Sequence, residues 1–176
     1  DYGRPDFEKW LQTESYKRLF KTKLPQHGLQ GYYNFDNGTL NNVIKANQQG
    51  AMKRELSSVP GDQPVFEDSA EGKCLVLNGD EWLDLNPVGV FGKSDPFSIV
   101  IRVWIPKELS EGVIFHKCIA ERLYNYRGYH LYLKDNRLEL SLAHSAPSNA
   151  ITRITSEPVP RNQWLQLVFT YDGSSR

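Results

Sequence analysis

The chain has 176 residues, of which 21 are basic and 21 are acidic, so its formal net charge is zero. A chain of this length fits one domain and typically buries about 70% of its unfolded surface, enough for a core without metal or disulfide staples. The balanced charge argues against a nucleic acid partner. The sequence contains no run of about 18 apolar residues, so no membrane insertion is predicted. With only two cysteines, a disulfide-rich scaffold is excluded.

Residues 5–23 carry the one convincing helical pattern in the sequence. Pro5 suits a first helical position, and the apolar residues then recur at steps of three and four: Phe7, Trp10, Leu11, Tyr16, Leu19 and Phe20. We predict an N-terminal helix within a linker of residues 1–28, the tail of a preceding domain, with its apolar stripe packed on a neighbouring domain. Because the sequence begins without an initiator Met or an apolar leader, we expect it to start inside a longer protein.

From residue 29 the pattern changes to short β-type runs separated by Gly, Asn, Asp and Pro. The expected strands cover residues 29–35, 49–54, 64–67, 73–77, 82–85, 97–105, 112–117, 128–134, 137–143, 149–155 and 163–171. Many short strands at this spacing favour an all-β fold, an antiparallel sandwich of two sheets.

Three of these runs carry the strongest signals. Residues 97–105 are apolar at nearly every position, which predicts a central strand covered on both faces. Residues 129–133 and 138–142 alternate around a turn, which predicts a hairpin whose leucines face one core. The opposite face of that hairpin should then carry His130, Tyr132, Glu139 and Ser141. Residues 164–171 form another strong strand, which ends at the turn signal Asp172-Gly173.

A resemblance to a known family follows from motifs in this order. The motifs are Phe35-Asp36, the run 77–85, the run 95–99 with Trp104, and Gln163-Trp164 followed by residues 170–173. Together they resemble laminin-G-like domains of the concanavalin-A-like lectin/glucanase superfamily, which implies a two-sheet jelly roll over residues 29–176. Members of the superfamily usually continue past the Asp-Gly turn, so we expect this domain to be truncated at its C-terminus.

A narrower resemblance rests on residues 112–117, 126–131 and 146–151. These runs are similar to the laminin-G-like insert of planctomycete-type cytochrome c proteins, which are bacterial. The resemblance implies export to the periplasm or cell surface, flanking domains in the parent chain, and a haem group elsewhere in that parent. Haem attachment within this chain is not expected, because the sequence contains no Cys-x-x-Cys-His motif.

The superfamily includes glycoside hydrolases, which need two carboxyl groups facing one sugar bond, about 5 Å apart in retaining enzymes. No Glu-x-Asp-x-Glu pattern occurs here. Glu81 and Asp84 are three residues apart, which places them on opposite faces of a strand, and Glu139 stands alone on its own strand. We therefore predict a module without catalytic activity.

The richest candidate for ligand recognition is the segment 118–130, which joins two expected strands. It carries aromatic and planar polar groups that suit sugars and protein partners alike: Arg122, Tyr124, Tyr126, Arg127, Tyr129 and His130. The alternative is that these rings pack against the sandwich and the arginines pair with nearby carboxylates.

Metal binding and cysteine chemistry give weaker signals. His116, His130 and His144 lie in or beside expected strands, and a close trio could bind a transition metal. Laminin-G-like domains often hold Ca²⁺, and the carboxylates at strand ends here are Asp36, Asp80, Asp84 and Asp172. Cys74 lies in an apolar run and is expected to be a buried thiol, the alternative being a bridge to Cys118.

Three functional hypotheses follow from the sequence. The leading one is a binding or docking module that positions the parent protein on a glycan or on its own neighbouring domains. The second is a structural spacer that only packs the flanking domains. The third is a glycoside hydrolase, which the missing carboxylate pair disfavours.

Overall fold

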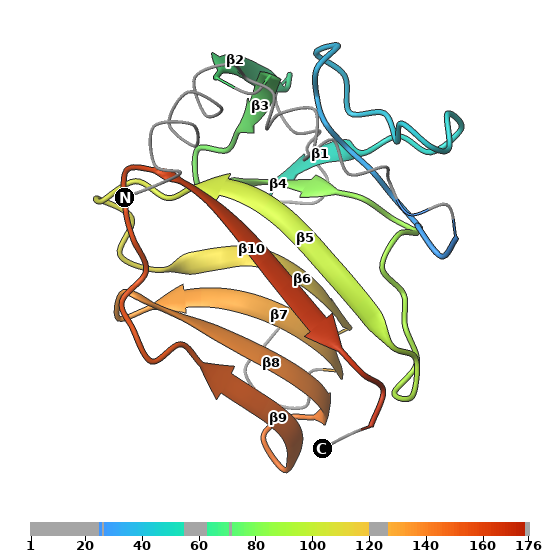
Figure 1. Cartoon of the computed structure of the whole chain (residues 1–176), viewed down its shortest axis with the longest axis vertical. Coiled ribbons are helices and arrows are strands. Elements are labelled where there is room, and N and C mark those ends of the chain that lie inside the picture. The colour runs from blue at the N-terminus through green and yellow to red at the C-terminus, as the bar shows by residue number, and fades with distance from the viewer. Residues whose placement is uncertain (1–24, 26, 55–62, 71, 120–126, 175–176) are drawn as a thin grey trace, which may run out of the picture. The chain divides into compact units, whose positions relative to one another are not determined.

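A computed structural model of the chain describes residues 25, 27–54, 63–70, 72–119 and 127–174 (Figure 1). These described residues are all-β and contain no helix, which confirms the predicted class. The predicted helix over residues 5–23 lies outside them. The strands are β1 (Ala51–Arg54), β2 (Val65–Ser69), β3 (Gly72–Val76), β4 (Glu81–Asp84), β5 (Phe97–Trp104), β6 (Gly112–Ile119), β7 (Arg127–Lys134), β8 (Arg137–Ser145), β9 (Asn149–Ile154) and β10 (Trp164–Tyr171).

The chain divides into two compact units. Among the described residues, unit 1 comprises 25, 27–51, 63–70 and 72–76, and unit 2 comprises 52–54, 77–119 and 127–174. The domain boundary expected at residue 29 stays a prediction.

Unit 1 is organised around the buried side chain of Asn42. Its Oδ1 accepts hydrogen bonds from the backbone N–H groups of Tyr32 (3.1 Å) and Ile44 (3.2 Å), while its Nδ2 donates to Gln48 Oε1 (3.0 Å). A strand was expected over 29–35, and none forms there. The Asn42 side-chain amide there binds a backbone N–H that a neighbouring strand would otherwise pair.

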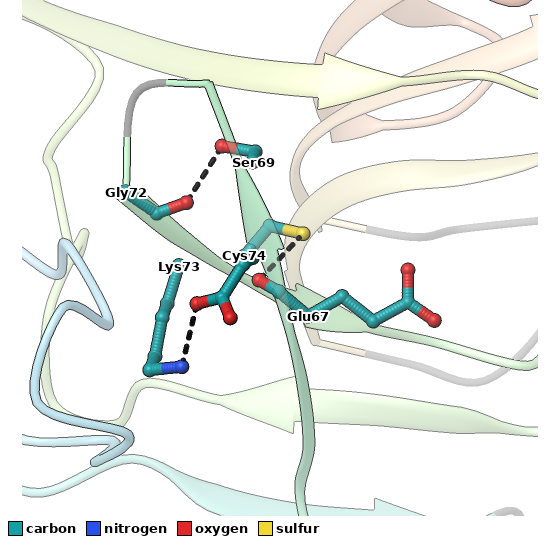
Figure 2. A network of polar contacts seen from close by, with 6 residues as sticks. Glu67, Ser69, Gly72, Lys73 and Cys74 are labelled. Carbon is teal, nitrogen blue, oxygen red and sulfur yellow. Dashed lines mark hydrogen bonds and ion pairs between the residues drawn. The ribbon is translucent and has the colours of Figure 1, made fainter.

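The β2–β3 hairpin completes unit 1, and Figure 2 shows its polar contacts. Lys73 Nζ lies 2.7 Å from Asp68 Oδ1, and Ser69 Oγ donates to the Gly72 carbonyl. Cys74 was expected to be a buried thiol, but its side chain is partly exposed and its Sγ lies 3.5 Å from the Glu67 carbonyl oxygen. In a two-stranded ladder one face stays open, so an apolar run alone does not bury the thiol. Cys74 and Cys118 are both free.

Unit 2 holds the larger sheets. Strands β6, β7, β8 and β9 pair in that order into a four-stranded antiparallel sheet, and β5 pairs with β10 over their whole length (Figure 1). Leu131, Leu133 and Leu138 of the four-stranded sheet form one core with Ile105 and Val159. Val103, Leu165 and Leu167 of the β5–β10 ladder pack against that core, so the inner faces of the two sheets contact each other.

The hairpin β7–β8 forms as predicted. Its turn residues Asp135 and Asn136 have positive φ angles of 49° and 59°, which a two-residue hairpin turn with left-handed central residues requires. The register pairs Leu131 with Leu140 and Leu133 with Leu138, which places the leucines on the core face. His130 pairs with Ser141 and Tyr132 pairs with Glu139 on the opposite face, as the alternation predicted.

One prediction about unit 2 is wrong. Strand β5 was expected to be covered on both faces, but its exposure alternates from residue to residue. Val100 and Trp104 point outward and are 62% and 47% exposed. Within the described residues β5 pairs only with β10, so its apolar side chains cover one core face and leave the other open. A continuous apolar run in the sequence therefore does not by itself show that both faces of the strand are buried.

Candidate functional site

The residues predicted to bind a ligand divide into three groups. Arg122, Tyr124 and Tyr126 lie outside the described residues, so their role stays a prediction. Arg127 is exposed at the start of β7, where its Nε approaches the His144 carbonyl oxygen at 3.5 Å. Tyr129 and His130 follow on β7 and point to opposite faces of the sheet.

Tyr129 is a core residue and is not displayed on a ligand-binding surface. Its side chain is 8% exposed, and its ring lies 5.0 Å from that of Phe97 and 6.3 Å from that of Phe115. Its hydroxyl donates a hydrogen bond of 2.7 Å to the Gly89 carbonyl. Burial, with a smaller contribution from Cys118, raises the pKa of Tyr129 to about 12. The expectation that Tyr129 faces a ligand is wrong. Side chains of β7 alternate between the two faces of the sheet, and Tyr129 points to the core together with Leu131.

His130 lies on the outward side of the four-stranded sheet, within a surface that we call the polar face. The polar face consists of His116, His130, Tyr132, Glu139, Ser141 and Thr152. Register brings His116 of β6 opposite His130 of β7, and Thr152 of β9 opposite Ser141 of β8. Sequence reasoning found the β7 and β8 members of this set. It missed His116 and Thr152, because only the pairing of strands places them there.

Two contacts join groups of the polar face to one another. His130 Nε2 lies 4.0 Å from Glu139 Oε1, and the hydroxyls of Ser141 and Thr152 are 3.1 Å apart. Burial lowers the pKa of His130, the carboxylate of Glu139 raises it, and the neighbouring His116 lowers it. Ser141 is only 2% exposed although it points away from the core.

A second outward surface lies on the β5–β10 ladder, and we call it the tryptophan platform. It consists of Arg102 and Trp104 on β5 with Trp164 and Gln166 on β10, paired as Trp104–Trp164 and Arg102–Gln166. The two indole rings meet edge to face at 6.1 Å between centroids. The Arg102 guanidinium lies 5.7 Å from the centroid of Trp164, within the range of a cation–π contact.

The tryptophan platform combines exposed aromatic surface with planar hydrogen-bonding groups. Trp104 is 47% exposed, and Arg102 and Gln166 are both exposed beside it. The sequence predicted none of this, since residues 97–105 read as a strand covered on both faces. The missed signal was the polar residue Arg102 within that run, together with a second Trp at the start of β10.

Two carboxylates considered for hydrolysis are engaged in local contacts. The Glu81 side chain is only 7% exposed, and its Oε1 lies 3.1 Å from Arg54 Nε. Asp84 Oδ1 accepts a hydrogen bond of 2.9 Å from the backbone N–H of Asn86. Each contact gives the carboxylate a structural role at the β4 strand or just after it.

The three histidines that could have formed a metal site do not come together. His116 and His130 face each other, but across the described residues no group of three or more His, Cys, Asp or Glu side chains could hold a metal ion. Asp172 accepts a hydrogen bond from the backbone N–H of Ser174, which lowers the pKa of its carboxyl. Calcium binding at the strand ends stays a prediction. The described part of the chain also contains no helix long and apolar enough to span a membrane.

Comparison with known proteins identifies one fold relative. No protein-family model matches the chain, and no curated protein matches it in sequence. Its structure is similar to domain 4 of AbnA, a GH43 extracellular arabinanase from Geobacillus stearothermophilus, solved in complex with arabinotriose. The TM-score is 0.60 at 23% identity, and the match covers 81% of this chain and 66% of that one. The likeness shows a shared fold, and the chain spans just under two thirds of that structure's length.

Proposed function

We propose that this chain is a non-catalytic carbohydrate-binding module whose ligand lies across the tryptophan platform. The observation that carries the proposal is the half-exposed Trp104, in edge-to-face contact with Trp164 and with Arg102 and Gln166 beside the pair. A sugar ring presents an apolar face of C–H groups and an edge of hydroxyls. Aromatic faces match the first, and a few well-placed planar polar groups match the second.

The rigidity of the tryptophan platform supports this function. Both tryptophans lie on paired strands backed by the core, so their rings are held before a ligand arrives. A preorganised surface loses little conformational entropy on binding. The Trp104–Trp164 edge-to-face contact further restricts the indole rotamers, leaving the exposed part of Trp104 as the stacking surface.

The fold relative supports the same class of ligand. Domain 4 of AbnA was solved with arabinotriose, so the shared fold has a member that holds a short oligosaccharide. The finer proposal is a laminin-G-like jelly roll, exported to the periplasm or cell surface within a longer bacterial cytochrome-c-associated protein. In that proposal Arg122, Tyr124 and Tyr126 of the segment 118–130 also bind the ligand, and loop carboxylates with backbone carbonyls hold Ca²⁺.

The test is a glycan array probed with the whole chain, followed by titration calorimetry with each glycan bound and with arabinotriose. Trp104→Ala is expected to weaken binding by about tenfold or more, because it removes the stacking surface. Trp82→Ala is the matched control, since Trp82 is a 38% exposed tryptophan on β4, outside the tryptophan platform. Binding that survives Trp104→Ala unchanged would place the ligand elsewhere, and an array without signal would exclude carbohydrate binding.

A second candidate function is docking against a flanking domain of the parent chain. Val100 and Val168, which pair across the β5–β10 ladder, are 62% and 61% exposed and extend the tryptophan platform with apolar surface. An apolar strip of this kind favours a protein partner. The two functions separate in the array experiment, because docking alone gives no glycan signal.

A further inference from the structure

The two tryptophans of the tryptophan platform lie at one end of the β5–β10 ladder. Trp104 is the last residue of β5 and Trp164 is the first residue of β10, so their pair closes the register at that end (Figure 1). The ends of strands open more readily than their centres. The contact between the two indole rings, 6.1 Å between centroids, therefore depends on what holds the chain just beyond the ladder.

Asn162 joins the two chain segments directly beyond that pair. Its backbone N–H donates a hydrogen bond of 3.0 Å to the Ile105 carbonyl, and its Oδ1 accepts one of 2.9 Å from the backbone N–H of Lys107. Its φ angle is 52°, in the left-handed region, which asparagine adopts more readily than most residues. One residue thus ties the segment before β10 to the segment after β5 at two points.

Arg161 adds a second connection, which reaches two other loops. Its Nη1 donates to the carbonyl oxygens of Pro106 (3.1 Å) and Leu109 (3.0 Å), which belong to the loop between β5 and β6. Its Nε donates to Asn136 Oδ1 (2.7 Å) in the β7–β8 turn. Hydrogen bonds from a charged donor are stronger than neutral ones. We call Arg161 and Asn162, together with these five hydrogen bonds, the ladder clamp.

The ladder clamp adjoins the tryptophan platform along both strands. Arg161 precedes Trp164 by three residues, and Ile105 directly follows Trp104. Without the clamp, the strand ends that carry the two indoles would be free to separate. A surface that its ligand must first order binds more weakly, because the ordering costs conformational entropy.

We infer that Arg161 is a positioning residue for glycan binding, which acts through the ladder clamp by holding Trp104 and Trp164 in the arrangement that receives the sugar. This inference rests on the proposed function, which it deepens by naming a residue outside the binding surface that sets how well this surface is formed. The alternative is that the ladder clamp stabilises the fold and leaves the tryptophan platform unchanged.

The test measures both glycan affinity and the geometry of the tryptophan pair in the whole chain. Two coupled indole rings give an exciton couplet in far-UV circular dichroism, and Trp104→Phe identifies the part due to Trp104 and Trp164 because it removes one partner. Arg161→Ala is expected to weaken this couplet and to lower the affinity for arabinotriose and for each glycan bound on the array by about three- to tenfold. Arg161→Lys should restore part of both, because lysine keeps the charge without the fork of donors.

Asn162→Gly is a second and milder variant. Glycine keeps the backbone N–H and adopts the left-handed conformation without strain, so the substitution removes only the side-chain acceptor for Lys107. Calorimetry should show about a twofold loss of affinity, with a smaller change in the couplet. This variant tests the ladder clamp even where Arg161→Ala does not fold, and an unchanged affinity and couplet would then overturn the inference.

Arg137→Ala is the matched control, since Arg137 also donates to a backbone carbonyl, that of Thr155, but on the four-stranded sheet. It should keep the couplet and the affinity of the unsubstituted chain, and thermal denaturation shows that each variant is folded. A folded Arg161→Ala that keeps either its couplet or its affinity would overturn the inference while the carbohydrate-binding function stands, as would an equal loss of affinity in Arg137→Ala. Absence of any glycan binding by the unsubstituted chain would overturn the function, and the inference with it.

Discussion

The two outward surfaces of unit 2 are built on the same kind of antiparallel ladder and are backed by the same core, yet they differ in chemistry. On the polar face, His130 lies beside Glu139 and Ser141 beside Thr152, and Ser141 is almost completely buried. On the tryptophan platform, half-exposed Trp104 lies beside Trp164, and the Arg102 guanidinium is 5.7 Å from the Trp164 centroid. The more polar of the two surfaces is therefore not the one with the more exposed aromatic area for a ligand.

The polar face also shows why a predicted site residue can lie on the less suitable surface. The sequence predicts His130 as a ligand-binding residue because it follows a segment rich in Tyr and Arg. In the structure it is half-buried opposite His116, and its Nε2 lies 4.0 Å from Glu139 Oε1. The tryptophan platform lies on strands that are separated from it by many residues along the chain and carry no such local signal.

The largest expected effect concerns the core that both surfaces share. Leu133 is fully buried at the centre of this core, and Leu133→Ala is expected to lower the free energy of unfolding by about 2–5 kcal/mol. Chemical denaturation measures this loss, and glycan binding should fall with the folded fraction. Leu133→Met, which conserves volume, is the control and should cost less than about 1.5 kcal/mol. A small loss in Leu133→Ala would show that the two sheets do not share this core.

A smaller effect separates the surfaces by pH. Burial is the main cause that lowers the pKa of His130, so the folded protein binds its proton less readily than the unfolded chain does. The stability contributed by neutral His130 is therefore complete above the unfolded pKa of about 6.5 and is lost as the pH falls through the lower folded value. The melting temperature between pH 8 and pH 5 should fall less steeply in His130→Gln.

The exposed His144→Gln is the control for this measurement and is expected to keep the pH dependence of the unsubstituted chain. Glycan binding at the tryptophan platform should change little between pH 8 and pH 6, since the platform contains no histidine and no carboxylate. Equal slopes in the two histidine variants would contradict a specific role for His130.

The smallest effect concerns the valines beside the tryptophan platform. Val100→Thr keeps a β-branched side chain on an exposed position, so the free energy of unfolding should change by less than about 0.5 kcal/mol. Glycan affinity should also stay within about twofold if sugar binding depends on the tryptophans. A loss of more than about 1 kcal/mol in denaturation experiments would show that this strip packs against another part of the protein.

Much of the fold could be predicted from local sequence patterns. The β7–β8 hairpin follows from alternating leucines around Asp135-Asn136, whose positive φ angles the structure confirms. The strand expected over 29–35 fails because Asn42, which lies outside that run, binds the backbone of Tyr32. The site could be predicted only in part, since periodicity assigned His130, Tyr132, Glu139 and Ser141 to one face but gave no information on strand order.

The sequence by itself determined the all-β class, the positions of most strands and the two faces of the β7–β8 hairpin, because these depend on turns and on alternation over a few residues. Only the tertiary structure decided that β5 pairs with β10 and leaves one face open, that Tyr129 is buried beside Phe97, and that Trp104 meets Trp164. Trp104 and Trp164 are distant along the chain, and no local pattern records which strands become neighbours. The proposed binding surface therefore exists only once the strands are paired.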